Sequence, residues 1–377
     1  MDLLELRKEI DKIDSELIPL LLSRMEVSKK VAQYKIENNI PVLNEQREKE
    51  ILESVAKRCD NQGETIKTVF SAIMDASRAL QHKIIGDGKE LKDEINSALG
   101  KKIKTKNSTV ACFGDLGSNA HNACNKVFEN SYVNFYKSFE DIFEAVNNGS
   151  ADYGIVPVEN STAGSVHESY DLIMKYRFYI VGAVDIPINH CICVKNGTNS
   201  ENVTKVYSHH QALRQCDNYI KKHDLVPINY SNTAGAAKFV SESSASDIAA
   251  VCSVSAAEKY GLQIVQKGIE DVKGNTTRFI IISKKLIVEN GADKISLIFS
   301  LPHLTGSLYR VLGRFAMAGL NMTKLESRPL KDGSSFAYSF YVDLLGNVQN
   351  EETLELLCAL YSELPDFTFL GNFIETN

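Results

Sequence analysis

The sequence lacks the features that would place the protein in a membrane or on a nucleic acid. No apolar run among its 377 residues approaches the roughly 20 residues that a helix needs to cross a bilayer. Basic residues are not in excess, and the formal net charge of -6 argues against nucleic acid or an anionic membrane as partner. The opening residues, MDLLELRKEIDKID, are typical of a charged helix and not of a signal peptide. Small anionic ligands stay open, because local clusters of charge can override the average.

Metal-binding and redox motifs are also missing. The eight cysteines are scattered, and none is spaced C-x-x-C. His190, Cys191 and Cys193 come closest to a metal cluster, but they lie in the apolar run IPINHCICV, which is more typical of a buried strand. We therefore expect no metal and no cofactor, and we expect a soluble protein with reduced thiols in the cytoplasm.

Glycine is absent from the first 62 residues, and this part of the chain has helical periodicity. Helices are predicted at about 3–37, 44–58 and 63–84, and Pro19 should kink the first or unpair one of its backbone bonds. The apolar positions follow a 3,4 spacing typical of a coiled-coil seam: Leu6, Ile10, Ile13, Leu17, Leu20, Val27 and Val31. Three such helices cannot bury this seam alone, so we expect a homo-oligomer, a dimer or higher.

The remainder of the chain has mixed periodicity. Residues 86–108 are polar and charged and predict a linker with one short helix. Short apolar runs then alternate with helical segments, which indicates an α/β domain with two lobes. Residues 294–377 predict the βαββαβ order of the α+β ferredoxin-like motif. The predicted domains are all-helical 1–88, a linker 89–107, α/β 108–285 and α+β 294–377.

Two cations interrupt the apolar seam of the first helix. Arg24 takes a seam position, and Lys35 follows eleven residues later, close to three turns on and nearly on the same face. Cations on an apolar stripe repel each other unless an anion joins them. The alternative is that the two side chains reach solvent at the ends of a helical bundle, and the spacing does not decide between these readings.

The segments LRKEID, LLLSRMEVSKKVAQYK, REKEIL and DASRALQ resemble the all-helical chorismate mutase family. That resemblance implies rearrangement of chorismate to prephenate in an intertwined dimer, with Arg7 supplied by the partner chain and with Lys35 and Gln81 donating to the ether oxygen. Asn44 departs from the aspartate common in that family. The substrate pocket implied by the resemblance consists of Arg7, Arg24, Lys35, Asn44, Arg47, Glu48, Ser77 and Gln81.

In the α/β part, several apolar runs lead into helix starts that carry Ser, Thr or Asn beside small residues. Examples are VACFGDLGSNAHNAC, PVENSTAGSV, YSHHQALRQC and NYSNTAGAAKFV. The first is not G-x-G-x-x-G, which argues against a dinucleotide site. One such loop is usually only a capped helix, but several together predict a cleft lined with hydroxyls and amides that binds a polar anion.

These segments, together with NTTRF, resemble prephenate dehydratase over residues 108–284. The family has two lobes like periplasmic binding proteins and converts prephenate to phenylpyruvate, so the resemblance makes Thr277 the essential hydroxyl and Arg278 a carboxylate contact or positioner. Asp115, Ala120 and His210 depart from the family pattern. Further cleft residues implied are Asn160, Ser161, Ser208, Gln211 and Thr233, with Glu159 less firmly assigned.

The C-terminal segment resembles the ACT regulatory domain that follows prephenate dehydratases, through LTGSLYRVLGRFAMAGLNMTKLESRP. A glycine at a helix start lets an amino-acid carboxylate approach backbone N–H groups. The resemblance implies a site for L-phenylalanine between two chains, formed by Gly306, Ser307, Leu308 and Tyr309 and by Glu326, Ser327, Arg328 and Pro329.

Together these resemblances predict a bifunctional enzyme of phenylalanine biosynthesis that acts on chorismate and prephenate and is inhibited by L-phenylalanine. Two alternatives remain: a non-catalytic sensor of aromatic metabolites, or a chain in which only one of the two activities is retained.

Overall fold

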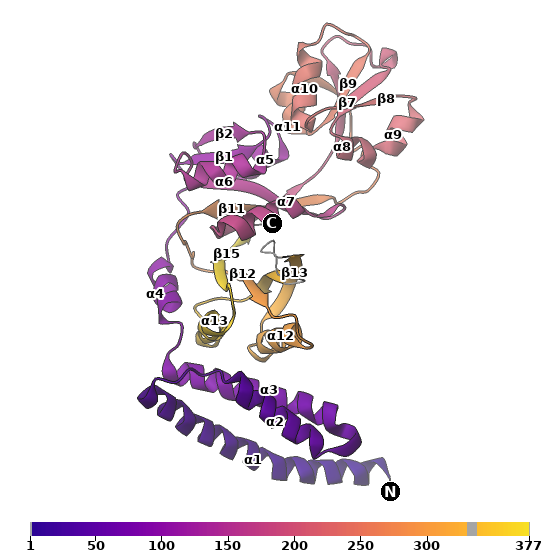
Figure 1. Ribbon diagram of the computed structural model, residues 1–377. Helices are drawn as coiled ribbons and strands as arrows, with labels where there is room; N and C mark the ends of the chain where they lie inside the picture. Colours follow the sequence, from indigo (N-terminus) through magenta and orange to yellow (C-terminus); the bar gives the residue numbers. More distant parts are fainter. Residues whose placement is uncertain (1, 330–337, 377) are drawn as a thin grey trace. The chain divides into compact units, whose positions relative to one another are not determined.

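The computed structural model describes residues 2–329 and 338–376 of the chain (Figure 1). The chain divides into two compact units. The first unit combines Met1–Ser97 with Leu297–Phe369, and the second combines Ala98–Ser296 with Leu370–Asn377. None of the described helices has the length and apolar character that a membrane span requires.

The first unit begins with three long helices, as predicted: α1 (Leu3–Asn38), α2 (Glu45–Lys57) and α3 (Gly63–Ile85), with a short 3-10 turn at Asp60–Gln62. Local signals fix their ends. Asp2 and Glu5 form a capping box at the start of α1, and the side chain of Asn44 accepts from the backbone of Arg47 at the start of α2. α3 ends at Gly86, whose φ of 75° is a conformation that glycine adopts freely.

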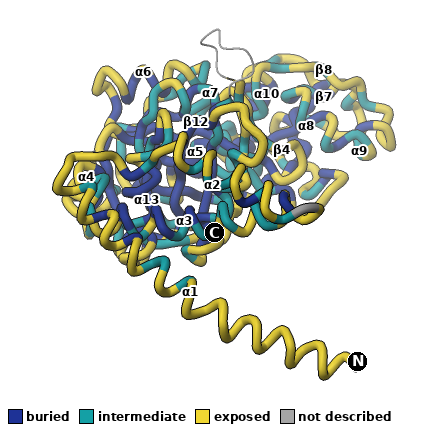
Figure 2. Tube along the Cα trace, turned by 60° about the horizontal axis from the view of Figure 1, so that its bottom comes forward, coloured by how far each residue is buried: buried dark blue, intermediate teal, exposed yellow. Residues whose placement is uncertain are grey.

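Helix α1 is mostly exposed, as Figure 2 shows for its N-terminal part. Only Ser28 and Ala32 are buried in this helix. The helix continues through Pro19 without interruption. A proline lacks the N–H that would bond four residues back, so Pro19 removes one helical bond but does not end the helix. The seam residues lie uncovered in the single chain, among them Ile13 at 63% and Leu20 at 68% exposure.

The C-terminal segment has the predicted βαββαβ order: β12 (Lys294–Leu301), α12 (Ser307–Met317), β13 (Asn321–Pro329), β14 (Tyr338–Leu345), α13 (Glu351–Glu363) and β15 (Thr368–Phe373). The sheet order β13-β14-β12-β15 is that of the ferredoxin-like split motif, with β13 at one edge. The sequence of this segment predicts its third strand at 335–343, and residues 335–337 of that range lie outside the described residues. The linker holds one helix, α4 (Lys89–Ala98), as expected.

The second unit has two α/β lobes, which confirms the two-lobed prediction. The sheet of lobe 1 has the order β16-β5-β11-β3-β1-β2, with β4 paired to β3. Its elements are β1 (Thr109–Phe113), α5 (Asn119–Val127), β2 (Tyr132–Tyr136), α6 (Phe139–Asn147), β3 (Tyr153–Asn160), β4 (Gly164–Ser165), α7 (His167–Tyr176), β5 (Tyr179–Pro187), β11 (Thr276–Ser283) and β16 (Glu375–Thr376).

Lobe 2 has the sheet order β10-β6-β9-β7-β8. The chain enters this lobe after β5 and returns at β11, so two crossing segments connect the lobes. Its elements are β6 (Cys191–Lys195), a 3-10 turn (Ser200–Asn202), β7 (Lys205–Ser208), α8 (His210–Gln215), α9 (Asp217–Lys222), β8 (Val226–Asn229), α10 (Thr233–Glu242), β9 (Ile248–Cys252), α11 (Val254–Lys259) and β10 (Leu262–Lys267).

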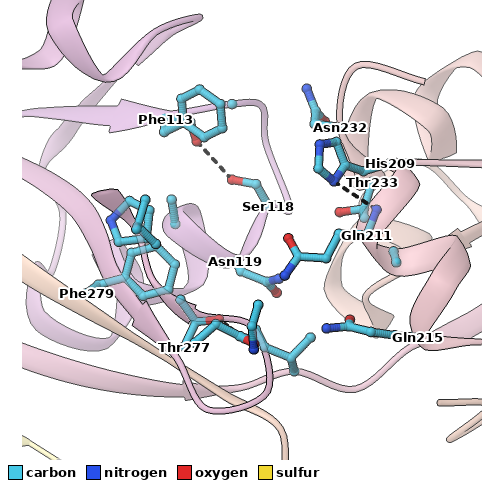
Figure 3. A pocket seen from close by; sticks show the side chains of 18 of the residues that line it. Phe113, Ser118, Asn119, His209, Gln211, Gln215, Asn232, Thr233, Thr277 and Phe279 are labelled. Carbon is cyan, nitrogen blue, oxygen red and sulfur yellow. Dashed lines mark hydrogen bonds between the residues drawn. The ribbon is translucent and has the colours of Figure 1, made fainter. Parts of the chain in front are cut away.

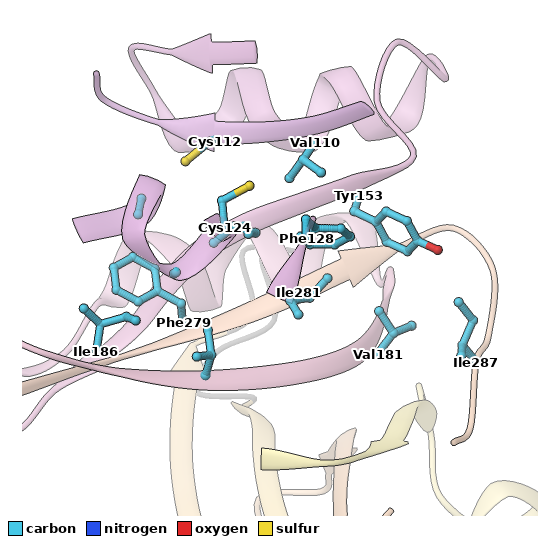
Figure 4. Packing of buried hydrophobic residues seen from close by; sticks show 14 of the residues in the cluster. Val110, Cys112, Cys124, Phe128, Tyr153, Val181, Ile186, Phe279, Ile281 and Ile287 are labelled. Atoms are coloured by element: carbon cyan, nitrogen blue, oxygen red, sulfur yellow. The ribbon is translucent and has the colours of Figure 1, made fainter. Parts of the chain in front are cut away.

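Strand β11 crosses the core of lobe 1. Phe279 and Ile281 pack there with Ile155, Val181 and Ile186, all buried (Figure 4). The strand therefore begins with polar residues and continues into an apolar core, which anchors the polar end firmly.

The run from His190 to Cys193 forms a buried strand start, as predicted. Cys191 and Cys193 are fully buried, and their Sγ atoms lie 3.3 Å apart. The thiol of Cys252 on β9 completes a group of three sulfur atoms within 4.8 Å of one another. This group belongs to the apolar core of lobe 2.

Candidate active sites

A cavity of about 440 Å³ lies between the two lobes of the second unit, and we call it the interlobe cavity (Figure 3). Lobe 1 contributes Ser118, Asn119, Asn160 and Thr277, and lobe 2 contributes a facing set of polar side chains. The lobe 2 residues are His209, Gln211, Gln215, Ser231, Asn232 and Thr233, and His190 lies just before the first strand of this lobe. Phe113, Phe139, Ile188 and Phe279 form the apolar part of the wall. Such a wall suits a small ring compound with polar substituents.

Thr277 is held by its neighbour across the sheet. It pairs with Asn160 in the antiparallel register of β11 and β3, and the Asn160 amide donates to Thr277 Oγ1 at 2.9 Å. Asn160 Oδ1 in turn accepts from the backbone N–H groups of Thr162 and Ala163, at 3.1 and 3.0 Å. These bonds set the amide orientation, so the threonine oxygen accepts from Asn160 and its own O–H proton remains available to donate.

Hydrogen bonds connect the two lobes around the cavity. Gln215 Nε2 donates to Thr162 Oγ1 at 3.2 Å, and Ser253 Oγ donates to the carbonyl of Gly117 at 2.9 Å. Gly117 has a φ of 81°, and a Cβ there would lie 2.7 Å from the Cα of Ala256. Only glycine allows this close approach of the lobes.

The described residues that line the interlobe cavity include no Lys, Arg, Asp or Glu. Two histidines lie there. The His190 Nε2 is 2.9 Å from the Gln215 Oε1, and burial first and then the charge of His210 lower the pKa of His209, which favours its neutral ring. Positive potential comes instead from helix N-termini. Ser118 caps α5 and Asn232 caps α10, and both residues line the cavity. The free N–H groups and dipoles of these helix starts favour bound carboxylates.

Three residues that the sequence predicts in the interlobe cavity lie outside it. Arg278 follows Thr277 in a strand, so its side chain points to the opposite face, where its Nε and Nη2 bind the Asp185 carboxylate at 3.1 and 3.3 Å. Ser208 is fully buried and donates to the carbonyl of Val251 at 2.6 Å. Ser161 is exposed and accepts from the backbone N–H of Thr276 at 2.9 Å. These residues support the wall, whereas Asn160, Gln211, Thr233 and Thr277 line it.

The structure also places the three residues that depart from the family pattern. Asp115 does not line the cavity; its carboxylate accepts from the Asn232 amide at 2.8 Å, and so connects the lobes. Ala120 lies in the cavity wall, while His210 is exposed and lines a neighbouring hollow.

Sequence reasoning missed several residues of the wall. Ser118, Asn119 and Asn232 all stand at the helix starts that the sequence marked, and that signal could have identified them individually. Phe113, Phe139 and Gln215 carried no such signal. Phe113 and Phe139 lie in different elements with ring centroids 4.6 Å apart, and only the fold brings them together.

The helices of the first unit bring together a second group of predicted residues, which we call the helical site: Arg24, Lys35, Glu48, Ser77 and Gln81. Arg24 donates from α1 to the hydroxyl of Ser77 on α3. Gln81 lies one turn further on, donates to the Ser77 carbonyl at 3.3 Å, and is only 7% exposed. Its Oε1 is buried without a partner among the described residues. An unsatisfied buried amide oxygen is costly and marks a place where a ligand group can bind.

Lys35 and Glu48 complete the helical site from α1 and α2. Burial lowers the pKa of Lys35, and the nearby charge of Glu48 opposes this shift. Lys35 Nζ donates to the carbonyl of Val42, so the ammonium is held next to the turn between α1 and α2. Glu48 is partly buried, with 15% of its side chain exposed, and it pairs with Arg78 at 3.1 Å.

Three further residues of the substrate pocket predicted from the sequence remain exposed in the single chain and are not part of the helical site. Arg47 has 68% of its side chain exposed and pairs with Glu50, and Asn44 serves as the cap of α2. Arg7 is exposed on α1, 17 residues before Arg24, which at 1.5 Å per residue is about 25 Å along the helix. Arg7 therefore cannot reach the pocket that contains Arg24 of its own chain.

The residues predicted to bind an effector lie at two places in the C-terminal segment. Gly306 has a φ of 84° and starts α12, with Ser307 and Leu308 as its first helical residues. Glu326, Ser327 and Arg328 lie on the edge strand β13. An edge strand can pair with a strand of another chain.

Comparison with protein families finds two matches. Residues 6–82 match the family model described as chorismate mutase type II, and residues 110–287 match the one described as prephenate dehydratase. The first range contains the helical site, and the second contains the interlobe cavity.

Individual proteins resemble the whole chain or most of it. A protein of Aquifex aeolicus named bifunctional chorismate mutase/prephenate dehydratase is 34% identical, over 99% of this chain and 98% of its own length. A chloroplastic Arabidopsis thaliana protein named arogenate dehydratase/prephenate dehydratase 2 is 38% identical, over 70% of this chain and 72% of its own. A crystal structure of prephenate dehydratase from Arthrobacter aurescens in complex with L-Phe is 27% identical, with a TM-score of 0.64, and the match covers 70% of this chain and 89% of that one.

Proposed function

The chain belongs to the family of bifunctional chorismate mutase/prephenate dehydratases, enzymes of phenylalanine biosynthesis, and from this membership we propose how its residues perform the two reactions. The helical site rearranges chorismate to prephenate, and the interlobe cavity converts prephenate to phenylpyruvate. The observation that carries the proposal is the pairing of Asn160 with Thr277 inside the cavity.

The mutase reaction needs a binding surface and no nucleophile. Chorismate is a dicarboxylate, and its rearrangement within one molecule is accelerated when the reactive conformer is held in place. Arg24 binds a carboxylate, with Ser77 orienting the guanidinium. Lys35 and the second N–H of the Gln81 amide, the one not bonded to the Ser77 carbonyl, donate to the ether oxygen, on which negative charge grows as the bond breaks. Glu48 accepts from the substrate hydroxyl.

The dehydratase reaction is driven by loss of carbon dioxide. The bond between the ring and its carboxylate breaks, carbon dioxide leaves, and the electron pair of that bond enters the ring and expels the hydroxyl group. The departing hydroxyl takes up one proton from solvent and leaves as water. The Thr277 O–H is the donor that stabilises negative charge on the departing oxygen, because Asn160 already occupies the acceptor side of the threonine oxygen. Gln211 and Thr233 hold the substrate from lobe 2, and the starts of α5 and α10 hold its carboxylates. Arg278, Ser161 and Ser208 support the wall.

The C-terminal segment is proposed to be an ACT domain that binds L-phenylalanine and inhibits the enzyme. Its ferredoxin-like sheet order and the glycine at the start of α12 support this assignment. So does the Arthrobacter aurescens prephenate dehydratase, whose structure contains L-Phe. The amino-acid carboxylate would approach the backbone at Gly306, Ser307 and Leu308, and Glu326, Ser327 and Arg328 would complete the site.

We further propose that the enzyme is a homo-oligomer, a dimer or higher, in the cytoplasm. The exposed seam of α1 supports association, because Ile13, Leu17 and Leu20 would be covered by a second copy. A second α1 would also bring Arg7 to the helical site of its partner. The proposed domains are mutase 1–88, linker 89–107, dehydratase 108–285 and ACT 294–377.

Feeding chorismate to the purified protein and following prephenate and phenylpyruvate separately tests both assignments. Both products should form in sequence. Prephenate that accumulates unchanged would show that only the mutase is active, and no turnover of either compound would favour the non-catalytic sensor. Calorimetry with L-phenylalanine tests the ACT assignment, and the absence of heat across millimolar ligand would contradict it.

A further inference from the structure

A residue of the C-terminal segment reaches the helical site within the first unit. Arg310 lies on α12, and its Nη2 is 3.0 Å from Glu48 Oε2 on α2 and 3.4 Å from Asp75 Oδ1 on α3. Helix α12 contacts α3, and both helices belong to the first unit (Figure 1). Arg310 is therefore in direct ionic contact with one of the residues that the mutase assignment depends on.

The carboxylates of Glu48 and Asp75 both pair with a second arginine as well. Arg78 on α3 pairs with Glu48 at 3.1 Å and also with Asp75, so two arginines and two acids form one cluster. The exposed fractions of the Glu48, Asp75 and Arg78 side chains are 15%, 6% and 8%. Among the described residues, Arg78 and Arg310 are the two arginines within ion-pair distance of these carboxylates, so without Arg310 the two shielded carboxylates share the single guanidinium of Arg78.

Arg310 is not part of the mutase sequence itself. The matched chorismate mutase range ends at residue 82, whereas Arg310 lies 235 residues after Asp75. It also lies only four residues after Gly306, one turn into α12. The position of Glu48 thus depends on a helix that belongs to another part of the chain.

We propose that Arg310 is a positioning residue for the mutase reaction, supplied by the C-terminal segment, which holds the Glu48 carboxylate where it meets the substrate. The inference rests on the proposed function, in which Glu48 accepts from the substrate hydroxyl. Arg310 acts through Glu48 and does not itself touch the substrate. A disturbance at the start of α12 reaches the mutase pocket by this route.

The test is mutase and dehydratase kinetics on the full-length chain with Arg310→Ala and Arg310→Lys. A contact to the substrate hydroxyl is present in the ground state and the transition state alike, so its misplacement raises KM more than it lowers kcat. Arg310→Ala should raise the mutase KM about tenfold with kcat within about twofold of wild type. Arg310→Lys should recover part of the loss, and dehydratase turnover of supplied prephenate should not change.

Lys83→Ala is the matched control. Lys83 on α3 pairs with Glu355 on α13 at 2.9 Å, so this change removes another ion pair between the same two segments without touching Glu48. An equal rise in KM in Lys83→Ala would show that Arg310 only helps the segments to dock, and would overturn the proposal. An unchanged KM in Arg310→Ala would overturn it as well.

Combining Arg310→Ala with Glu48→Gln separates this inference from the assignment of Glu48. If Arg310 acts through Glu48, its replacement should have little further effect in the Glu48→Gln background. The same loss in both backgrounds would contradict the inference and leave the mutase assignment intact. If Glu48→Gln alone leaves the mutase unchanged, the role proposed for Glu48 fails, and the inference fails with it.

Discussion

In the assignment proposed above, the helical site and the interlobe cavity recognise related dianions by opposite means. The helical site has formal charges on the long side chains of Arg24, Lys35 and Glu48, which come from two helices. The interlobe cavity has no Lys, Arg, Asp or Glu among the described residues of its wall, and it relies on hydroxyls, amides and the starts of α5 and α10. A bundle of long helices offers few free backbone N–H groups, whereas an α/β lobe places helix starts beside its cleft.

Because the two sites use different residues, we expect a substitution in one site to reduce only the reaction assigned to that site. The largest effect is expected for Thr277→Ala, which should reduce phenylpyruvate formation about a thousandfold or more, because it removes the hydroxyl proposed to donate to the leaving oxygen. Prephenate should then accumulate from chorismate, as followed by chromatography of both products.

Thr276→Ala is the control for that change. Thr276 precedes Thr277 on β11 but does not line the cavity, and its hydroxyl contacts only the Gly274 carbonyl, at 3.5 Å, in the described structure. It should retain most of the activity. Equal loss of both reactions in Thr277→Ala would refute separate sites.

Lys35→Ala should lower mutase turnover by about two orders of magnitude, since it removes one of two donors to the ether oxygen. Dehydratase activity on supplied prephenate should be unaffected. Lys29→Ala is the control, because Lys29 lies on the same helix and pairs with Glu26 at 2.6 Å on the exposed face. A mild effect of Lys35→Ala on kcat would count against its assigned role.

The absence of acidic side chains from the described cavity wall also predicts a substrate preference. Arogenate carries an ammonium group where prephenate carries a keto oxygen, and the wall offers no carboxylate to pair with that charge. We expect kcat/KM to be about tenfold lower for arogenate than for prephenate, because a shielded charge without a partner is costly. Competition between the two compounds measures the ratio, and equal use of both would show that another group pairs with the ammonium.

The smallest effect is expected for Glu375→Gln. Glu375 on β16 pairs with Arg278 and, at 2.6 Å, with Lys294, whose side chain is only 4% exposed. Arg278 keeps its bonds to Asp185, so the strand that carries Thr277 should shift little, and dehydratase kcat should fall about two- to fivefold.

The mutase activity of the Glu375→Gln protein serves as the internal reference. The control variant is Glu129→Gln. Glu129 lies in the same lobe but forms an exposed pair with Lys106, with 69% of its own side chain exposed. A loss in Glu129→Gln as large as that in Glu375→Gln would show that the effect is a general response to lost charge.

Much of this architecture was predictable, because it depends on local periodicity. The ends of α1, α2 and α3, the linker helix α4, the alternation of strands and helices in the two lobes and the βαββαβ order all follow from spacing, caps and glycines. Strands β2, β8 and β10 are partly or largely exposed, so no short apolar run marks them in the sequence. The opposite direction of Arg278 could have been foreseen from strand alternation, since Thr277 and Phe279 share the cavity face.

By itself the sequence determined which helices and strands form and which polar residues stand at their ends, because caps, helical spacing and strand alternation act over a few residues. Only the tertiary structure decided which of these residues meet. The register of β11 against β3 places Asn160 against Thr277, burial turns Ser208 away from the cavity, and the packing of α12 on α3 brings Arg310 to Glu48. The Asn160–Thr277 and Arg310–Glu48 contacts join residues more than a hundred positions apart. Such contacts are selected by the total burial of apolar surface and charge, which no local pattern encodes.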